Sequence, residues 1–271
     1  MTGDREPQDT TIGFLSQPLD RGMNKLVTTN YMSEKIRAMA TPGVHEKFFA
    51  FFMDVIGKET QRQILDVGAG YGAFSKRLHE AGFTEFACDL SPEKFQYRTI
   101  ECRKADITSM IPYEDNYFDV IVAIEVVEHM IDHEDFFHEC RRALKSGGKL
   151  MISTPNILSL KSRAMFLVSG FFYGFKPIDM SKAYGLSHVS SITLDQYKYI
   201  ANKNDFDVYK VEVDKYQSTS KLLLWLWIFL YAFTKLRKID FSAHNNLKVL
   251  LGRKLFMAFQ ARENGTALAT K

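Results

Sequence analysis

The sequence predicts an α/β fold in which a mostly parallel sheet is covered by helices on both faces. Residues 64–67 form a short apolar run, typical of a buried parallel strand, which breaks abruptly into a glycine-rich turn. A helical spacing of apolar residues follows, and similar strand and helix patterns alternate over residues 61–156. The chain has 271 residues, of which 46% are hydrophobic and 25% charged, so it is long enough for one domain with a full core.

Three glycines, Gly68, Gly70 and Gly72, mark the turn after the first strand. Glycine suits such a turn because it adopts backbone angles that other residues avoid. It also lets a ligand approach the backbone amides and the N-terminus of the following helix. The spacing fits a loose dinucleotide fingerprint as well, so it does not by itself name the ligand.

Acidic residues around the turn narrow the choice to a charged nucleoside. Asp66 stands two residues before the first glycine, where it can reach an ammonium group and would repel a pyrophosphate. Asp89 ends the second strand, residues 85–89, where a carboxylate can take both hydroxyls of a ribose. Asp106 follows a third short segment and can accept a hydrogen bond from an adenine amino group.

With these residues the chain resembles the class I S-adenosylmethionine-dependent methyltransferases, closely over residues 64–156. The resemblance implies a Rossmann-like, seven-stranded, mostly parallel sheet with helices on both faces and an antiparallel last strand. It identifies residues 118–124 and 149–153 as the fourth and fifth strands, and residues 206–213 and 255–262 as the last two. It also implies S-adenosyl-L-methionine as the cofactor. The residues expected to bind it are Asp66, Gly68, Ala69, Gly70, Asp89, Leu90, Asp106, Ile107, Ile124 and Glu125.

A second cluster, Glu125-Val-Val-Glu128-His129, follows the fourth strand. On a helical turn, residues three and four apart share a face, so Glu125 can meet both Glu128 and His129. Two carboxylates and an imidazole can bind a hard divalent ion such as Mg²⁺, which would lower the pKa of an acceptor hydroxyl.

The pattern of this cluster is similar to that of the ubiquinone-pathway O-methyltransferases and of the small-RNA terminal 2′-O-methyltransferases, where these residues ligate a metal. A later histidine completes the site in the RNA enzymes, and His188 is the candidate here. The metal ligands implied are therefore Glu125, Glu128, His129 and His188. A metal-free catalytic site, with His129 as the base and Glu128 beside it, is the alternative, and a purely structural role is the third interpretation. Asn156, after the fifth strand, is expected either to point toward the same site or to cap a turn.

The domain organisation is expected to be simple. Residues 1–20 read as a mobile tail, residues 21–262 as a single methyltransferase domain, and residues 263–271 as a second tail. Inserts at about 158–186 and 218–250 interrupt the domain. Besides the helices of the alternating pattern, we expect a helical lead-in over residues 24–60. We also expect a helix directly after Asp89, because Ser91-Pro92 supplies an N-cap and a proline at the first helical position.

The two inserts hold most of the information about the substrate. The first is rich in aromatic and aliphatic side chains between Met165 and Phe175. The second contains an unbroken apolar run, residues 222–233, that is too short to span a bilayer, which needs about 20 residues. Lysines and arginines flank this run, so residues 221–238 suit peripheral contact with an anionic membrane surface. A lid over the substrate pocket and a homodimer contact are the alternatives.

The function expected from these features is methyl transfer to oxygen in a small hydrophobic, or a lipid- or glycan-linked, acceptor. RNA 2′-O-methylation is the runner-up, but the net charge of +3 and the lack of a recognised RNA-binding module disfavour nucleic acid. A catalytically inactive cofactor-fold subunit and a nicotinamide oxidoreductase are further alternatives. Residues 1–9 are polar and acidic, unlike a secretory signal, so we expect a cytoplasmic location or a peripheral one at the membrane. The three cysteines are expected to be reduced.

Overall fold

The computed structural model describes residues 36–181, 187–238 and 242–263, which all belong to one compact unit. The expected tails therefore lie outside the described residues, except for Glu263. The strands are β1 (Gln63–Val67), β2 (Thr84–Asp89), β3 (Cys102–Lys104), β4 (Phe118–Ile124), β5 (Leu144–Pro155), β6 (Phe206–Val213) and β7 (Lys254–Ala261). The helices are α2 (Val44–Ile56), α3 (Ala73–Glu80), α4 (His133–Ala143), α5 (Leu160–Ser169), α6 (Leu194–Lys203), α7 (Ser218–Leu222), α8 (Trp225–Arg237), α9 (Ser242–Asn245) and α10 (Leu247–Leu251).

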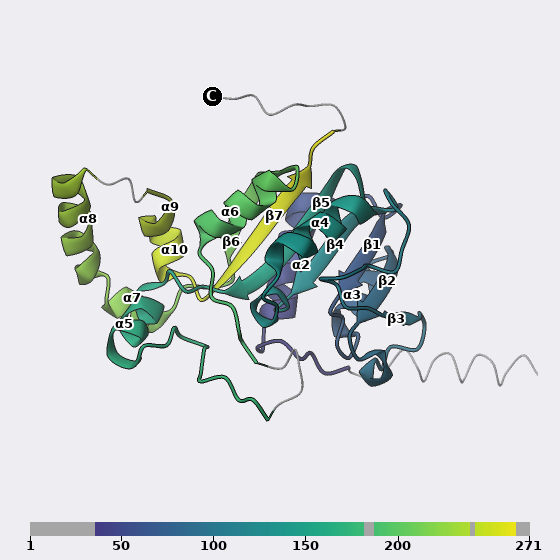
Figure 1. Cartoon of the computed structure of the whole chain (residues 1–271), viewed down its shortest axis with the longest axis horizontal. Helices are drawn as coiled ribbons and strands as arrows, with labels where there is room; N and C mark the ends of the chain where they lie inside the picture. The colour runs from purple at the N-terminus through teal and green to yellow at the C-terminus, as the bar shows by residue number, and fades with distance from the viewer. Residues whose placement is uncertain (1–35, 182–186, 239–241, 264–271) are drawn as a thin grey trace, which may run out of the picture. The chain divides into compact units, whose positions relative to one another are not determined.

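The strands form one seven-stranded sheet in the order β3-β2-β1-β4-β5-β7-β6 (Figure 1). Strands β1 to β5 pair in parallel, whereas β7 is antiparallel to both of its neighbours, β5 and β6. The predicted fold class is confirmed, and the limits of the predicted fourth and sixth strands match the structure. Because β6 runs parallel to β1, its carboxyl end lies at the same edge of the sheet as the glycine turn.

Helices cover both faces of the sheet because successive side chains of a strand point to opposite sides. In β4, Val120 and Val122 join a core cluster with side chains of α2 and α3. Ile121 and Ala123 face the other way, into a cluster with side chains of α4 and α6. β4 is therefore buried on both faces, which explains its unbroken apolar run.

The helix expected directly after Asp89 does not form. Only a single 3-10 turn, Pro92–Lys94, follows β2, and Phe95 is already extended. The reason lies in the packing of this segment: Phe95 and Tyr97 are buried and press against Gly72, where an added Cβ would come within 2.7 Å of the Phe95 ring. Their burial against the glycine turn outweighs the local N-terminal signal of Ser91-Pro92.

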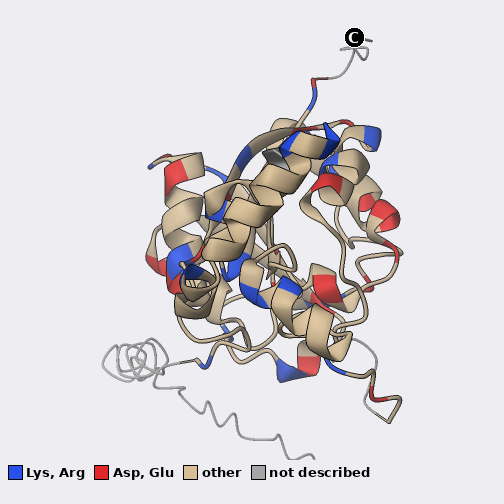
Figure 2. Ribbon diagram, turned by 90° about the vertical axis from the view of Figure 1, so that its left-hand side faces the viewer, with Lys and Arg blue, Asp and Glu red and all other residues tan. Residues whose placement is uncertain are grey.

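Between β6 and β7 the chain makes a helical excursion, α7 to α10, which leaves the sheet after Val213 and returns at Lys254. Figure 1 shows α8 beyond α9 and α10, away from the sheet, and Figure 2 shows it in the foreground. Helix α5 packs with α7 and α10. The apolar run of the second insert is thus divided between the end of α7 and most of α8.

Candidate functional site

A cavity of about 450 Å³ opens at the carboxyl ends of the parallel strands. Its walls come from the turns after β1 and β2, the segments after β3 and β4, the start of β7 and the segment before α6. All predicted site residues except one contribute to the wall. They are Gly68, Ala69, Gly70, Asp89, Leu90, Asp106, Ile107, Ile124, Glu125, Glu128, His129 and His188.

The glycine turn is built for close approach of the backbone to a ligand. Gly68 and Gly70 have φ angles of +65° and +55°, in the left-handed region that side chains disfavour. A Cβ on Gly68 would come within 2.6 Å of a methyl group of Val126, and one on Gly70 within 2.9 Å of the Met39 sulfur. Gly72 then gives way to α3, whose N-terminus faces the turn. A side chain at Gly68 or Gly70 would therefore clash with residues of the cavity wall, Val126 or Met39.

The carboxylate of Asp89 is fixed in the cavity wall by two backbone amides. Its Oδ2 accepts a hydrogen bond of 2.9 Å from Gly70 N, and its Oδ1 accepts one of 2.8 Å from Ser91 N. These backbone donors fix the carboxylate beside the glycine turn that follows β1. Each oxygen keeps a further lone pair, so the group can still accept two hydroxyl donors.

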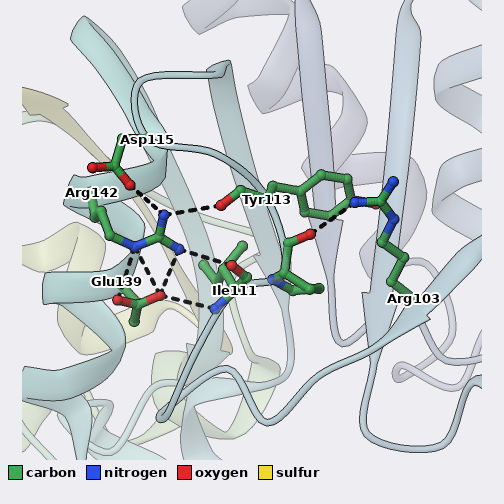
Figure 3. Close-up of polar contacts among 7 residues, drawn as sticks. Arg103, Ile111, Tyr113, Asp115, Glu139 and Arg142 are labelled. Carbon is green, nitrogen blue, oxygen red and sulfur yellow. Dashed lines mark hydrogen bonds and ion pairs between the residues drawn. The ribbon is translucent and has the colours of Figure 1, made fainter.

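Asp106 follows β3, next to β2, and lines the cavity in a more exposed position. Its Oδ1 accepts hydrogen bonds from the amide and the hydroxyl of Thr108, at 3.1 and 2.7 Å. The segment that follows is tied down by Arg142, which donates to the carbonyl oxygens of Ile111 and Tyr113 and pairs with Glu139 (Figure 3). This anchoring keeps the loop after Asp106 in place at the cavity.

Asp66 lies behind the glycine turn rather than in the cavity wall. Its side chain is 2% exposed, and its Oδ2 accepts a 2.7 Å hydrogen bond from the hydroxyl of Ser75 in the first turn of α3. Strand alternation points Asp66 to the α3 face, together with Ile64. Its predicted direct contact with an ammonium group is therefore not supported. Burial raises the pKa of Asp66 from 3.8 to about 7, although the bond from Ser75 opposes the shift.

Replacing Asp66 with asparagine is expected to stabilise the protein increasingly as the pH rises. The folded state keeps a proton that the unfolded state releases from about pH 4 upward, so the free energy of unfolding of the wild type falls up to pH 7. Asparagine has no such proton, and the difference between the two proteins should grow by on the order of 1–4 kcal/mol between pH 4 and 8. Urea unfolding at several pH values measures this difference; a constant difference would contradict the raised pKa.

Glu128, His129 and His188 form an acid–imidazole cluster on one wall of the cavity. One ligand atom from each lies within 4.8 Å of the others, and Glu128 Oε1 is 3.9 Å from His188 Nε2. Val189 N and Ser190 N both donate to the carbonyl oxygen of Glu128, at 2.9 and 3.2 Å, which brings the chain around His188 to the cavity. The predicted approach of His188 to Glu128 is what the structure shows.

The carboxylate of Glu128 is fully buried, and among the described residues neither of its oxygens has a partner within hydrogen-bond geometry. Burial, together with the charge of Glu125, raises the pKa of Glu128 well above its usual range. A buried acid without a partner is costly, and such a group is commonly satisfied by a ligand or an ion. The arrangement therefore fits a bound cation or a hydrogen-bonding ligand at this wall.

The imidazole of His129 is oriented by the backbone. Its Nδ1 lies 2.9 Å from the carbonyl oxygen of Ser187. Because a carbonyl oxygen only accepts, Nδ1 carries the proton and Nε2 keeps a lone pair. Burial lowers the pKa of His129, and burial with the neighbouring His129 lowers the pKa of His188 to about 4. Both rings are thus neutral near pH 7 and can accept a proton or ligate a metal.

Glu125 does not belong to this cluster. Its Oε1 accepts a hydrogen bond of 3.1 Å from the Ser153 hydroxyl, and its Oε2 is paired with the ammonium group of Lys254. The φ of Glu125 is +58°, so the chain bends sharply there instead of continuing into a regular helix. The expected four-ligand site is therefore corrected to a three-residue cluster.

The sequence did not identify Lys254 as a site residue. This lysine begins β7, is 7% exposed and lines the cavity. Asn156, by contrast, serves the fold: its Nδ2 donates to the carbonyl oxygens of Val249 and Gly252 at 2.7 and 2.9 Å. Its oxygen accepts from Leu158 N, so the turn-capping interpretation of Asn156 holds.

The first insert reaches the site, but the second does not. Phe175 packs edge-on against His188 with ring centroids 5.2 Å apart, and Phe172 packs against Phe166 and Phe175. No residue of α8 lines the cavity described above. The first insert therefore adds aromatic side chains beside the cavity and α8 adds none, although the excursion that carries α8 leaves from the same edge of the sheet.

Comparison with known proteins finds similarity to methyltransferases. Residues 65–152 match the family model described as a methyltransferase domain. The chain is 27% identical over 112 residues to a ubiquinone biosynthesis O-methyltransferase of Nitrosomonas europaea, covering 38% of this chain and 48% of that protein. It is 34% identical over 106 residues to the human mitochondrial ubiquinone biosynthesis O-methyltransferase, covering 35% of this chain and 29% of that protein. The chain thus spans less than half the length of these relatives.

Solved structures share the fold at low sequence identity. A SAM-dependent methyltransferase from Archaeoglobus fulgidus is 17% identical with a TM-score of 0.54, and the match covers 88% of this chain and 99% of that one. An S-adenosylmethionine-dependent methyltransferase from Mesorhizobium loti is 15% identical with a TM-score of 0.51, covering 79% and 97%. Both matches support the Rossmann-like architecture.

Proposed function

We propose that this chain, whose residues 65–152 match the methyltransferase domain model, transfers a methyl group from S-adenosylmethionine to an oxygen atom of a small-molecule acceptor. The observation that carries the proposal is the position of Asp89, held by Gly70 N and Ser91 N at the lip of the glycine turn. A fixed carboxylate beside a bare backbone turn suits a nucleoside whose ribose hydroxyls need an acceptor.

The residues present fit the cofactor along the length of the cavity. The Gly68 to Gly70 turn, which a Cβ would obstruct, would hold the amino-acid end, and Asp89 would accept from the ribose. Asp106 and Ile107 would line the adenine site. When bound, the cofactor supplies an activated methyl group, so the chain's own task is largely alignment of the acceptor.

His129 is the residue that would remove the acceptor's proton. Its Nδ1 is engaged with the Ser187 carbonyl, which leaves Nε2 as the basic nitrogen in the cavity wall. A general base of this kind contributes roughly 10²–10⁴-fold to a rate. Glu128 lies beside it and would hold the acceptor or a cation.

A divalent metal is the second occupant that the cluster suits, through Glu128, His129 and His188. With Glu125 engaged by Lys254, the donor set is one carboxylate and two imidazoles. This set suits Mn²⁺, Fe²⁺ or Zn²⁺ better than the Mg²⁺ suggested by the sequence. A metal here would lower the pKa of an acceptor hydroxyl, and His129 would then be a ligand instead of the base.

An apolar acceptor is supported by the first insert. The rings of Phe172 and Phe175 extend the apolar packing to His188, so an aromatic or lipid-linked acceptor would meet apolar side chains beside the cluster. Names of the matched relatives agree with this acceptor class, since they include ubiquinone biosynthesis O-methyltransferases.

Native mass spectrometry of the freshly purified protein tests the proposal without knowledge of the acceptor. We expect a population that carries S-adenosylmethionine or its demethylated product, and uptake of added S-adenosylmethionine by the remainder. Retention of a nicotinamide dinucleotide, with no uptake of S-adenosylmethionine, would overturn the proposal. The same spectra, recorded before and after dialysis against a chelator, identify any metal.

A further inference from the structure

Helix α8 is an apolar helix that the rest of the described chain leaves uncovered. It carries two tryptophans, two phenylalanines and a tyrosine within Trp225–Arg237, and none of its residues is buried. Ile228, Phe229 and Leu236 are 63%, 66% and 82% exposed. A helix with this composition normally lies in a core, so its exposure calls for an external partner.

Four of the exposed apolar side chains of α8 form a stripe along the helix, and Tyr231 and Phe233 are exposed beside it. Trp225, Ile228, Phe229 and Leu236 recur at spacings of three, four and seven, which places them on one face of the helix. The other side is attached to the protein by Trp227, whose Nε1 donates a 3.2 Å hydrogen bond to the carbonyl oxygen of Asn245. The attachment orients the stripe outward.

Positive charge borders the stripe. Lys221 precedes α8, and Lys235, Arg237 and Lys238 lie at its C-terminal end (Figure 2). None of the four forms an ion pair with another described residue, and residues 215–238 contain no acid. The more distant basic residues Lys248 and Arg253 are already paired with acidic residues of the sheet edge. The four cations at the ends of α8 are thus available to an external anionic partner, whereas Lys248 and Arg253 are not.

Helix α5 also exposes apolar side chains, and it is hydrogen-bonded to the excursion that carries α8. Arg163 donates to the side chain of Asn245 and to the carbonyl oxygen of His244, both at 2.8 Å, and Lys161 N donates to the Ser220 hydroxyl. At the end of α5, Leu167 and Val168 are 86% and 87% exposed. The two helices therefore belong to one connected assembly (Figure 1).

We propose that the apolar stripe of α8, with its bordering cations, docks this protein on the surface of an anionic phospholipid bilayer. The 13-residue helix is roughly 20 Å long and too short to cross a membrane. Among the described helices, none is long and apolar enough to do so. A helix with aromatic side chains on one face and flanking lysines and arginines lies instead in the headgroup region.

The observations disfavour the two other roles of α8, a lid over the cavity and a contact with a second copy of the chain. A lid would line the cavity, and α8 contributes no residue to it. A second copy of α8 would bring more positive charge against these cations, with no acid in residues 215–238 to balance it, whereas anionic headgroups would neutralise them. Charge complementarity therefore selects the bilayer.

Membrane docking does not depend on the proposed function, but the use we assign to it, delivery of an acceptor, does. The excursion returns to the sheet at Lys254, which lines the cavity, so a docked α8 would hold the cavity edge near the bilayer. A lipid-linked acceptor would then reach the methyl-transfer site from the membrane surface.

Vesicle flotation tests the inference directly. The full chain is mixed with vesicles of phosphatidylcholine alone or with added phosphatidylglycerol. The variants are Trp225→Glu/Phe229→Glu, Lys235→Ala/Arg237→Ala/Lys238→Ala, and a matched control, Tyr199→Glu/Val208→Glu. The control changes exposed apolar residues of α6 and β6, outside the docking face.

We expect the wild type and the control to float with the anionic vesicles only. The apolar double variant should bind at least about tenfold less, and removal of each cation should cost roughly fivefold. No flotation of the wild type, equal flotation with both vesicle types, or flotation of the apolar double variant like the wild type would overturn the inference.

Two further measurements on the same preparations distinguish membrane docking from dimerisation and from cofactor binding. Sedimentation without vesicles would reveal a dimer that dissociates in Trp225→Glu/Phe229→Glu; combined with no flotation, this would make α8 a self-association surface and overturn docking. Titration with S-adenosylmethionine reports on the proposed function alone. Cofactor binding without flotation refutes only the docking, and flotation without cofactor binding refutes only the methyltransferase proposal.

Discussion

Replacement of Asp89 by alanine is expected to weaken the affinity for S-adenosylmethionine by about 10²-fold or more. The carboxylate would accept two hydroxyl donors, and each hydrogen bond to a charged group is worth about 1.5–3 kcal/mol. The substitution also leaves Gly70 N and Ser91 N without their acceptor, which loosens the turn. Titration calorimetry measures the effect.

Asp119→Ala is the matched control for this variant. Asp119 is also a strand aspartate held by hydrogen bonds, from Gln63 N and Lys145 Nζ, but it lies at the amino end of β4, away from the cavity. It should leave cofactor affinity unchanged. If Asp89→Ala binds the cofactor as well as the wild type does, while both are folded, Asp89 is not in the binding site.

Replacement of His129 by glutamine is expected to lower methyl transfer by about 10²–10⁴-fold without a comparable loss of cofactor affinity. Glutamine retains a donor toward the Ser187 carbonyl but has no basic nitrogen in place of Nε2. Transfer of a labelled methyl group to hydroxylated aromatic compounds and to a lipid extract measures the rate. Full activity of His129→Gln would remove this residue from catalysis.

The same assay with excess chelator separates the two roles of His129. If the wild type loses activity and regains it with added Mn²⁺ or Zn²⁺, His129 acts as a ligand together with Glu128 and His188. If the chelator has no effect, His129 acts as the base. Glu125→Gln offers a useful comparison, because Glu125 is paired with Lys254 and is not expected to be a metal ligand.

The parts of the fold that sequence predicted are those determined by neighbouring residues. The run from Ile64 through Gly72 carries its strand, turn and helix start within a few residues, and the structure reproduces all three. β4 was identified through the resemblance to the methyltransferases and has the expected limits. The helix expected after Ser91-Pro92 failed because distant packing, Phe95 and Tyr97 against Gly72, overrides a local signal.

In the candidate site, too, features set by neighbouring residues were predicted, and features set by distant contacts were not. Asp89 and Asp106 follow strand ends and line the cavity as predicted, since parallel strands end at one edge. Lys254 could not be identified, because it meets Glu125 across β5 and 129 positions along the chain. Glu125 was expected to meet Glu128 and His129 on one helical turn, but Glu125 has a positive φ and its carboxylate pairs with Lys254. The side to which Asp66 points depends on α3 packing, which spacing alone does not give.

Titration of the wild-type protein with S-adenosylmethionine, its demethylated product and NAD tests the central claim most directly. The cavity bounded by the Gly68 turn, Asp89 and Asp106 should bind the first two at one site per chain, with micromolar affinity, and should not bind NAD. No binding of S-adenosylmethionine or of its product by a folded sample, or tighter binding of NAD, would contradict the assignment of this cavity as a methyltransferase cofactor site.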